Sequence, residues 1–241
     1  MEFEVAAKTD VGRLRSKNED AFHVDAERGL FVVADGLGGH LGGEVASRLA
    51  VEEIVSYITA RDRDDVDEHL LRNAVISANE EIYYRSREDT SLLGMGTTVV
   101  VAVIKERTLW LAHVGDSRAY VLSEHGLTQL TEDHMLMSPL MKQGKRLGEH
   151  QQRQLYRGPL SRAVGVDKSV AIDTQEYEYG DEGLLLCTDG LTDMLLDKEI
   201  EDVIRTGAAP HEACDSLIRL ANEKGGIDNI TVIFVKTREK D

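Results

Sequence analysis

Three aspartates stand at the ends of apolar, strand-like runs, each close to a glycine. Asp35 ends the run FVVAD, Asp189 follows LLLC, and Asp228 precedes the run ITVIF. Carboxylates at strand ends can converge on one point, and glycine lets the backbone approach an ion and expose its carbonyl. Oxygen ligands without paired histidines or thiolates favour Mg²⁺ or Mn²⁺ over zinc. A single Asp-Gly pair is also typical of an ordinary turn, so this pattern alone fits either a hard-metal site or three turns.

The stretch Phe31–Glu44, FVVADGLGGHLGGE, also has the layout of strand, glycine loop and helix. That layout is typical of dinucleotide-binding units, in which a helix N-terminus holds pyrophosphate. Here Leu41 stands where the third glycine of the motif belongs, and Asp35 would repel a bare phosphate. The spacing therefore disfavours nucleotide binding.

Five short segments, in chain order, carry a more specific signal. They are RSKNEDAF (Arg15–Phe22), DGLGGH (Asp35–His40), GDSR (Gly115–Arg118), CTDG (Cys187–Gly190) and GGIDNIT (Gly225–Thr231). Together they closely resemble the signature segments of the metal-dependent protein phosphatases, the type 2C serine/threonine family, in their compact bacterial form. The resemblance runs from about Asp10 to Val235 and so covers nearly the whole chain.

This resemblance implies a site with two metal ions. Asp35 would bridge the two ions, and the Gly36 carbonyl would complete the second ion's site. Asp189 and Asp228 would hold the first ion. Asp116, in GDSR, matches the position where bacterial members of the family take a third, weaker ion together with Asp189.

The same resemblance assigns auxiliary roles to four more residues. Glu19 and Asp20 match an acidic pair that mainly holds the waters of the metals. Arg13 is matched to the arginine that grips the substrate phosphate, and a planar guanidinium can bind two phosphate oxygens at once. His40 matches the residue proposed to protonate the leaving group, which is useful because a serine or threonine alkoxide leaves poorly.

The implied reaction is hydrolysis of phosphoserine and phosphothreonine in proteins. Two divalent cations beside a shared water lower its pKa and give a metal-bridging hydroxide placed for in-line attack on phosphorus. Three aspartates against two dications leave a net charge of about +1, so the loaded site attracts a phosphate dianion. The expected cofactors are two Mn²⁺ or Mg²⁺ ions per chain, and the expected partners are phosphorylated proteins.

An alternative is a catalytically silent pseudophosphatase that binds phosphoproteins. That class predicts loss of a metal aspartate, whereas Asp35, Asp189 and Asp228 are all present. His113 and His134 are interpreted as structural residues. The DHS segment of the family reads Asp133-His134-Met135 here, which is one of the few departures from the family pattern.

The elements that position these residues follow an order of strands, two helices, more strands, two helices and a last strand. Short β-branched runs with tight turns predict antiparallel strands, and a 3.6-residue period predicts helices over 45–58 and 71–82. A second helical pair is predicted at Lys198–Arg205 and Pro210–Glu223. We expect an α+β fold, a four-layer αββα sandwich of two antiparallel sheets flanked by pairs of helices.

One segment, about 138–168, shows little periodicity and carries seven basic residues against two acidic ones. We call it the flap segment and interpret it as functional, because long irregular stretches in a domain usually are.

The bulk composition limits the class of protein. The 241 residues carry a formal net charge of −16, which argues against nucleic acid as a partner because phosphate backbones are bound by excess lysine and arginine. Two cysteines in apolar settings fit a reducing compartment. The N-terminus does not resemble a signal peptide, and no apolar run reaches the length of a membrane span. We expect one cytoplasmic domain over residues 1–241, acting as a monomer.

Overall fold

The described strands pair with antiparallel neighbours and form two separate sheets. The computed structural model describes residues 2–37, 42–136, 158–180, 183–206 and 209–238. The first sheet has the order β1 (Glu2–Asp10), β11 (Ile230–Arg238), β10 (Gly183–Cys187), β7 (Arg118–Ser123), β8 (Gly126–Gln129). The second has the order β2 (Asp20–Asp25), β3 (Leu30–Leu37), β5 (Val99–Lys105), β6 (Thr108–Val114), β9 (Asp173–Glu178), with β4 (Gly96–Thr97) beside β3.

The central strands direct apolar side chains to both faces of each sheet. In β3, Leu30, Val32 and Ala34 join a core cluster on one face, whereas Phe31 and Val33 join a second cluster on the other. Successive side chains of a strand point to opposite faces, so such a strand is buried on both sides. Strands β5 and β11 alternate in the same way.

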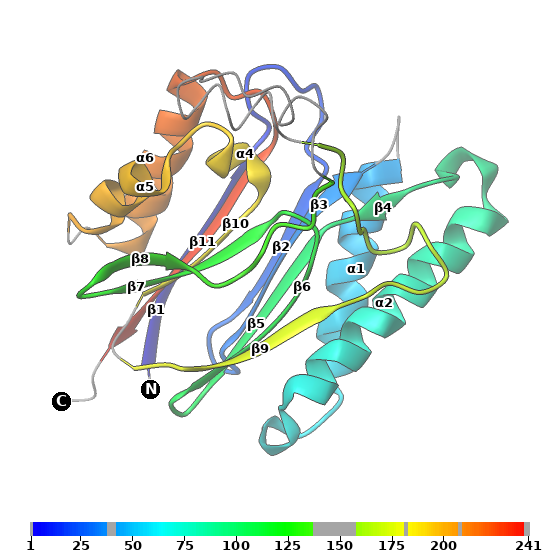
Figure 1. Cartoon of the computed structure of the whole chain (residues 1–241), viewed down its shortest axis with the longest axis horizontal. Helices are drawn as coiled ribbons and strands as arrows, with labels where there is room; N and C mark the ends of the chain where they lie inside the picture. The colour runs from blue at the N-terminus through cyan, green and yellow to red at the C-terminus, as the bar shows by residue number, and fades with distance from the viewer. Residues whose placement is uncertain (1, 38–41, 137–157, 181–182, 207–208, 239–241) are drawn as a thin grey trace.

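Helices cover the outer face of each sheet. Helices α1 (Gly42–Thr59) and α2 (Glu68–Glu88) pack on the second sheet, and α5 (Asp197–Ile204) and α6 (Pro210–Glu223) pack on the first. Figure 1 shows the α1–α2 pair on one side and the α5–α6 pair on the other, with both sheets between them. The predicted αββα sandwich is confirmed.

The sequence prediction missed some short elements. These are β4, β8, the one-turn helix α4 (Asp189–Thr192), and the 3₁₀ turns Arg63–Asp65 and Thr90–Leu92. Such pieces have too few residues to show a period. The β-branched run Thr97–Ile104 is divided between β4 and β5, with Thr98 between them.

Candidate metal centre

Asp35 lies where the pairing of β3 passes from β5 to β4. Its backbone N–H donates to Thr98 Oγ1 at 3.0 Å, and its carbonyl accepts from Thr98 N at 2.9 Å and from Thr97 Oγ1 at 2.8 Å. The Thr98 carbonyl accepts from Thr97 Oγ1. Two threonine hydroxyls therefore replace part of the strand ladder, and they fix the backbone that carries the Asp35 carboxylate.

Asp20 is the direct partner of Asp35 across the β2–β3 pair. Its Oδ2 accepts from Thr188 Oγ1 at 2.9 Å and from Thr231 Oγ1 at 2.6 Å. Its Oδ1 is buried and accepts no hydrogen bond within the part of the chain that the structure describes. Because a buried carboxylate oxygen without a partner is costly, this oxygen marks a place where a cation or its water fits.

Asp189 follows β10 and Asp228 precedes β11, and these two strands are neighbours in the first sheet. Thr188, at the end of β10, donates its N–H to Thr231 O at 3.0 Å, and Thr231 N donates to Thr188 Oγ1 at 3.0 Å. A Cβ on Gly190 would lie 2.0 Å from the Asn229 carbonyl oxygen. Only glycine permits this approach, so the start of α4, with Asp189, lies close against the residue that follows Asp228.

The electrostatics show that these carboxylates form one cluster. The pKa of Asp35 is raised well above its usual value, first by burial and then by the negative charges of Asp189, Asp20, Asp228 and Asp116. Burial also raises the pKa of Asp20 to about 7, although its two threonine hydrogen bonds act in the opposite direction. Like charges packed in a buried place favour protonation or a counter-cation.

Glu19 and Gly36 complete this end of the sheets. The Gly36 N–H donates to the Glu19 carbonyl at 3.1 Å, and burial raises the pKa of the Glu19 carboxyl. A Cβ on Gly36 would lie 2.1 Å from the Gly43 carbonyl oxygen and 2.5 Å from the Glu19 carbonyl oxygen. No side chain fits at position 36, so only backbone atoms of this position can contact a ligand.

The donor set fits a hard divalent cation. It consists of carboxylate oxygens, among them the buried Oδ1 of Asp20, which accepts no hydrogen bond from the described residues. Such all-oxygen sets suit Mg²⁺ and Mn²⁺. The mutual repulsion that raises the pKa of Asp35 would be relieved by bound cations.

Arg15, and not Arg13, contacts these carboxylates. Arg15 Nη2 donates to Asp228 Oδ2 at 2.7 Å, and that bond, with the charges of Asp228, Glu19 and Asp35, raises the pKa of Arg15. Arg13 is exposed, and its backbone N–H donates to the Gly226 carbonyl at 2.7 Å. Among the described residues, the Arg13 side chain forms no ion pair.

One side chain fixes the loop that carries both arginines. Asn229 Nδ2 donates to the carbonyls of Val11 and Lys17, at 2.9 Å and 2.8 Å, so one side chain holds both ends of the loop. Sequence spacing does not show which arginine of such a loop reaches the carboxylates. The useful signal in the sequence was that Arg15 opens the RSKNEDAF segment.

Asp116 lies in the turn between β6 and β7 and is buried, with 4% of its surface exposed. Its charge contributes to the raised pKa of Asp35. Ser117 Oγ lies 2.7 Å from Thr98 Oγ1, the same hydroxyl that accepts from Asp35 N. The turn is therefore joined directly to the backbone of β3 at the site.

His40 and most of the flap segment lie outside the described residues. Among the residues predicted from the sequence, the structure brings together Asp35, Gly36, Asp189, Asp228, Asp116, Glu19 and Asp20. The Arg13 side chain forms no ion pair with them within the described residues. His40 is not tested.

His113, His134 and Asp173 form a second polar group, with one ligand atom from each lying within 4.8 Å of the others. The two imidazoles are stacked, with centroids 4.6 Å apart and planes 22° apart. Lone pairs of imidazole lie in the ring plane, so stacked rings cannot both direct one at a single ion. This geometry favours a hydrogen-bonding role over a metal site.

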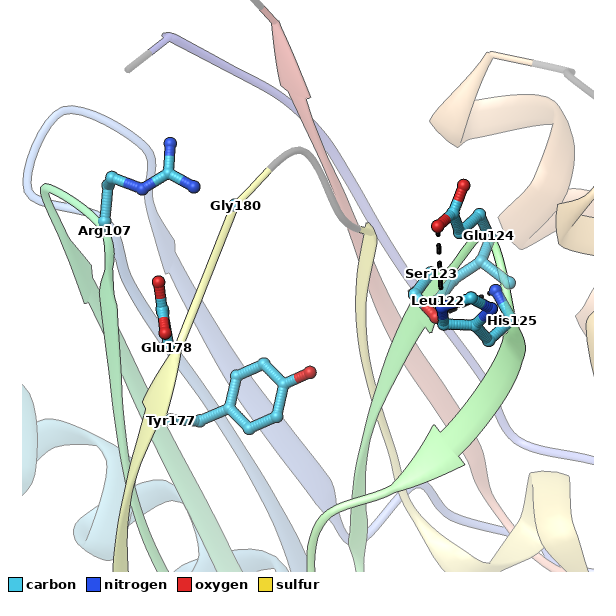
Figure 2. Close-up of a pocket in the computed structure, with 8 residues that line it drawn as sticks. All are labelled: Arg107, Leu122, Ser123, Glu124, His125, Tyr177, Glu178 and Gly180. Atoms are coloured by element: carbon cyan, nitrogen blue, oxygen red, sulfur yellow. Dashed lines mark hydrogen bonds and ion pairs between the residues drawn. The ribbon is translucent and has the colours of Figure 1, made fainter.

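A cavity of about 670 Å³ lies away from the carboxylate cluster. Figure 2 shows Arg107, Tyr177 and Glu178 on one side of it, facing the β7–β8 hairpin with Glu124 and His125. None of the carboxylates of the candidate site lines it. Its mixed charges select no single class of ligand.

Comparisons with known proteins agree with this fold and these motifs. A family profile described as protein phosphatase 2C matches residues 13–222. The serine/threonine phosphatase stp of Listeria monocytogenes is 38% identical over 240 residues, covering 95% of this chain and 94% of the relative. The crystal structure of the Mycobacterium tuberculosis serine/threonine phosphatase PstP/Ppp superposes with a TM-score of 0.88 at 32% identity, covering 99% of this chain and 100% of that one. A structure of the catalytic domain of PstP in complex with two manganese ions gives a TM-score of 0.81 at 31% identity, covering 98% and 99%.

The fold, the ordered motifs and the acidic site define a protein phosphatase, which is a hydrolase. The chain belongs to the protein phosphatase 2C family. The resemblance stated from the sequence is thereby confirmed. In the described part of the chain, no helix is long and apolar enough to cross a membrane.

Proposed function

We propose that this protein removes phosphate from phosphoserine and phosphothreonine of other proteins and depends on Mn²⁺ or Mg²⁺. The observation that carries the proposal is the carboxylate cluster, in which burial and then the charges of four neighbouring aspartates raise the pKa of Asp35. The names of the Listeria and Mycobacterium relatives, and the two manganese ions of the PstP catalytic domain, support it.

In this proposal Asp35, Asp189 and Asp228, with the Gly36 carbonyl, hold two divalent cations. Glu19 and Asp20 hold their waters, and Asp116 takes part in a third, weaker site. When bound, such cations lower the pKa of a coordinated water and neutralise phosphate charge. All three aspartates are present, so the pseudophosphatase alternative has no support from the residues.

The residues of the chain perform the remaining tasks. Thr97 and Thr98 hold the Asp35 backbone in place, so the carboxylate is oriented before substrate arrives. Arg15 uses Nη2 for Asp228, and its remaining N–H groups are available to two phosphate oxygens. We therefore propose Arg15, in place of Arg13, as the phosphate-binding arginine. His40 remains the predicted proton donor to the leaving alkoxide.

The direct test is hydrolysis of three matched peptides that carry phosphoserine, phosphothreonine or phosphotyrosine. We expect release of phosphate from the first two with Mn²⁺ or Mg²⁺, and none after treatment with EDTA. Malachite green detection of free phosphate gives the rates. Activity that persists in EDTA, or no activity with either metal, would contradict the proposal.

The arginine assignment is tested by two alanine variants. We expect Arg15→Ala to raise KM for the phosphoserine peptide at least about tenfold, because charge-assisted hydrogen bonds contribute roughly 1.5–3 kcal/mol. Arg13→Ala is the matched control and should stay within about twofold of wild type, because within the described residues the Arg13 side chain forms no ion pair with the carboxylates. A larger effect of Arg13→Ala than of Arg15→Ala would restore the prediction made from the sequence.

The further expectations concern the context of the enzyme. We infer that its substrates are phosphoproteins, as the names of the relatives suggest. One domain over 1–241, a monomer, a cytoplasmic location and no nucleic-acid partner stay predictions from the sequence.

A further inference from the structure

His134 lies where the Gly115–Ser117 turn meets the described part of the flap segment, residues 158–168. Its backbone N–H donates to the Gly115 carbonyl at 2.9 Å, and its ring Nδ1 accepts from Gly115 N at 3.1 Å. Its own carbonyl accepts from Ser161 N at 2.9 Å. One residue thus holds both polar backbone groups of Gly115 and the backbone of Ser161 in the flap segment.

The hydrogen bonds assign the tautomer of the His134 ring. Because the Gly115 N–H is a donor, Nδ1 must be the unprotonated acceptor, and the ring proton is on Nε2. Nε2 lies 3.1 Å from Asp173 Oδ2, and Arg162 Nη1 donates to Asp173 Oδ1 at 2.6 Å. The His134 side chain is 3% exposed, and its ring stacks on that of His113. A carboxylate that binds one ring N–H fixes both the orientation and the tautomer of the other nitrogen.

Gly115 transmits this constraint to the metal centre. It has φ +105°, and a Cβ there would lie 2.6 Å from Thr98. Thr98 Oγ1 contacts Ser117 Oγ and accepts from Asp35 N. Asp116 lies between Gly115 and Ser117, so the position of the turn sets where the Asp116 carboxylate stands relative to Asp35.

We propose that His134 is a positioning residue for metal binding at Asp116. Its unprotonated Nδ1 fixes Gly115, and Asp173 with Arg162 hold the ring so that Nδ1 faces that N–H. The flap segment and the metal centre are thus joined through one imidazole. This inference rests on the proposed role of Asp116 as a metal ligand.

The test is titration of the purified, metal-free full chain with Mn²⁺ by isothermal calorimetry, with thermal unfolding as the check on the fold. In His134→Ala we expect the affinity of the weakest Mn²⁺ site to fall about tenfold or more, as is usual when a supporting residue of a ligand is lost. His134→Asn should stay within about threefold of wild type, because its amide oxygen is as many bonds from the backbone as Nδ1. His125→Ala is the control, since His125 forms an exposed pair with Glu124.

Two further variants test whether His134 acts together with Asp173. Asp173→Ala should weaken the same site severalfold, and the double variant with His134→Ala should bind no more weakly than His134→Ala alone, because both act through one contact. Since Asp173 is half-exposed, this variant keeps the test decisive even if His134→Ala fails to fold.

Asp116→Asn provides the reference. If it binds Mn²⁺ as the wild type does, the proposed metal role of Asp116 fails. If it loses the weak site while His134→Ala and Asp173→Ala do not, the positioning role of His134 is overturned by itself. Equal losses in His134→Ala and His134→Asn would also overturn it, because the acceptor at Nδ1 would then not matter.

Discussion

Replacing Asp35 with asparagine should lower the rate of phosphopeptide hydrolysis by about 10³-fold or more. Loss of a metal ligand removes several kcal/mol of transition-state stabilisation, and each 1.36 kcal/mol is a factor of ten. The fold should be retained, because the amide has the shape of the carboxylate and the Asp35 backbone is held by Thr97 and Thr98. Steady-state rates with saturating Mn²⁺ measure the effect.

The same variant should make the metal-free protein more stable at pH 8. Burial and four neighbouring aspartates raise the pKa of Asp35, so its ionised form destabilises the folded state and asparagine removes that charge. Asp25→Asn is the matched control, because Asp25 lies at the opposite end of the β2–β3 pair. Full activity in Asp35→Asn, with the same number of Mn²⁺ ions bound as in wild type, would refute the bridging role.

Removal of metal should make the stability of the protein depend on pH in a particular direction. The folded-state pKa of Asp20 is raised from 3.8 to about 7. For a carboxyl with a raised pKa, the stabilising contribution is complete below the unfolded value and is lost as pH rises through the folded value. The metal-free protein should therefore be less stable at pH 8 than at pH 5.

The expected size follows from the shift, at about 1.4 kcal/mol per pKa unit, which gives a few kcal/mol and roughly 5–10 °C in Tm for a chain of this length. Mn²⁺ at pH 8 should restore the stability, because bound cations neutralise the cluster and bind only the folded state. Differential scanning calorimetry at both pH values, with EDTA and with Mn²⁺, measures this. Asp20→Asn should flatten the pH dependence, and equal Tm values for the metal-free wild type at pH 5 and pH 8 would count against it.

The sequence by itself determined the layers of the fold. Uninterrupted apolar runs such as Leu30–Ala34 and Val99–Ile104 require burial on both faces of a strand, and this is met when the sheets stack on each other and beneath helices. The aspartates at the strand ends were also visible, because their sites are defined by short segments with fixed local spacing.

Tertiary structure alone decided which side chains meet. Arg13 and Arg15 stand two residues apart in one loop, whose ends the Asn229 side chain holds, and it is Arg15 that reaches Asp228. The split between β4 and β5 depends on hydroxyls of Thr97 and Thr98 that bind the β3 backbone across the sheet.

His134 shows the same limit most clearly. The sequence analysis interpreted His134 only as a structural residue. Its contacts with Gly115, Asp173 and Ser161 join segments up to 39 residues away, and no local spacing encodes such contacts. The sequence determined the kind of metal site, because ligand type depends on residue identity; the tertiary structure decided which residues support it, because support depends on distance.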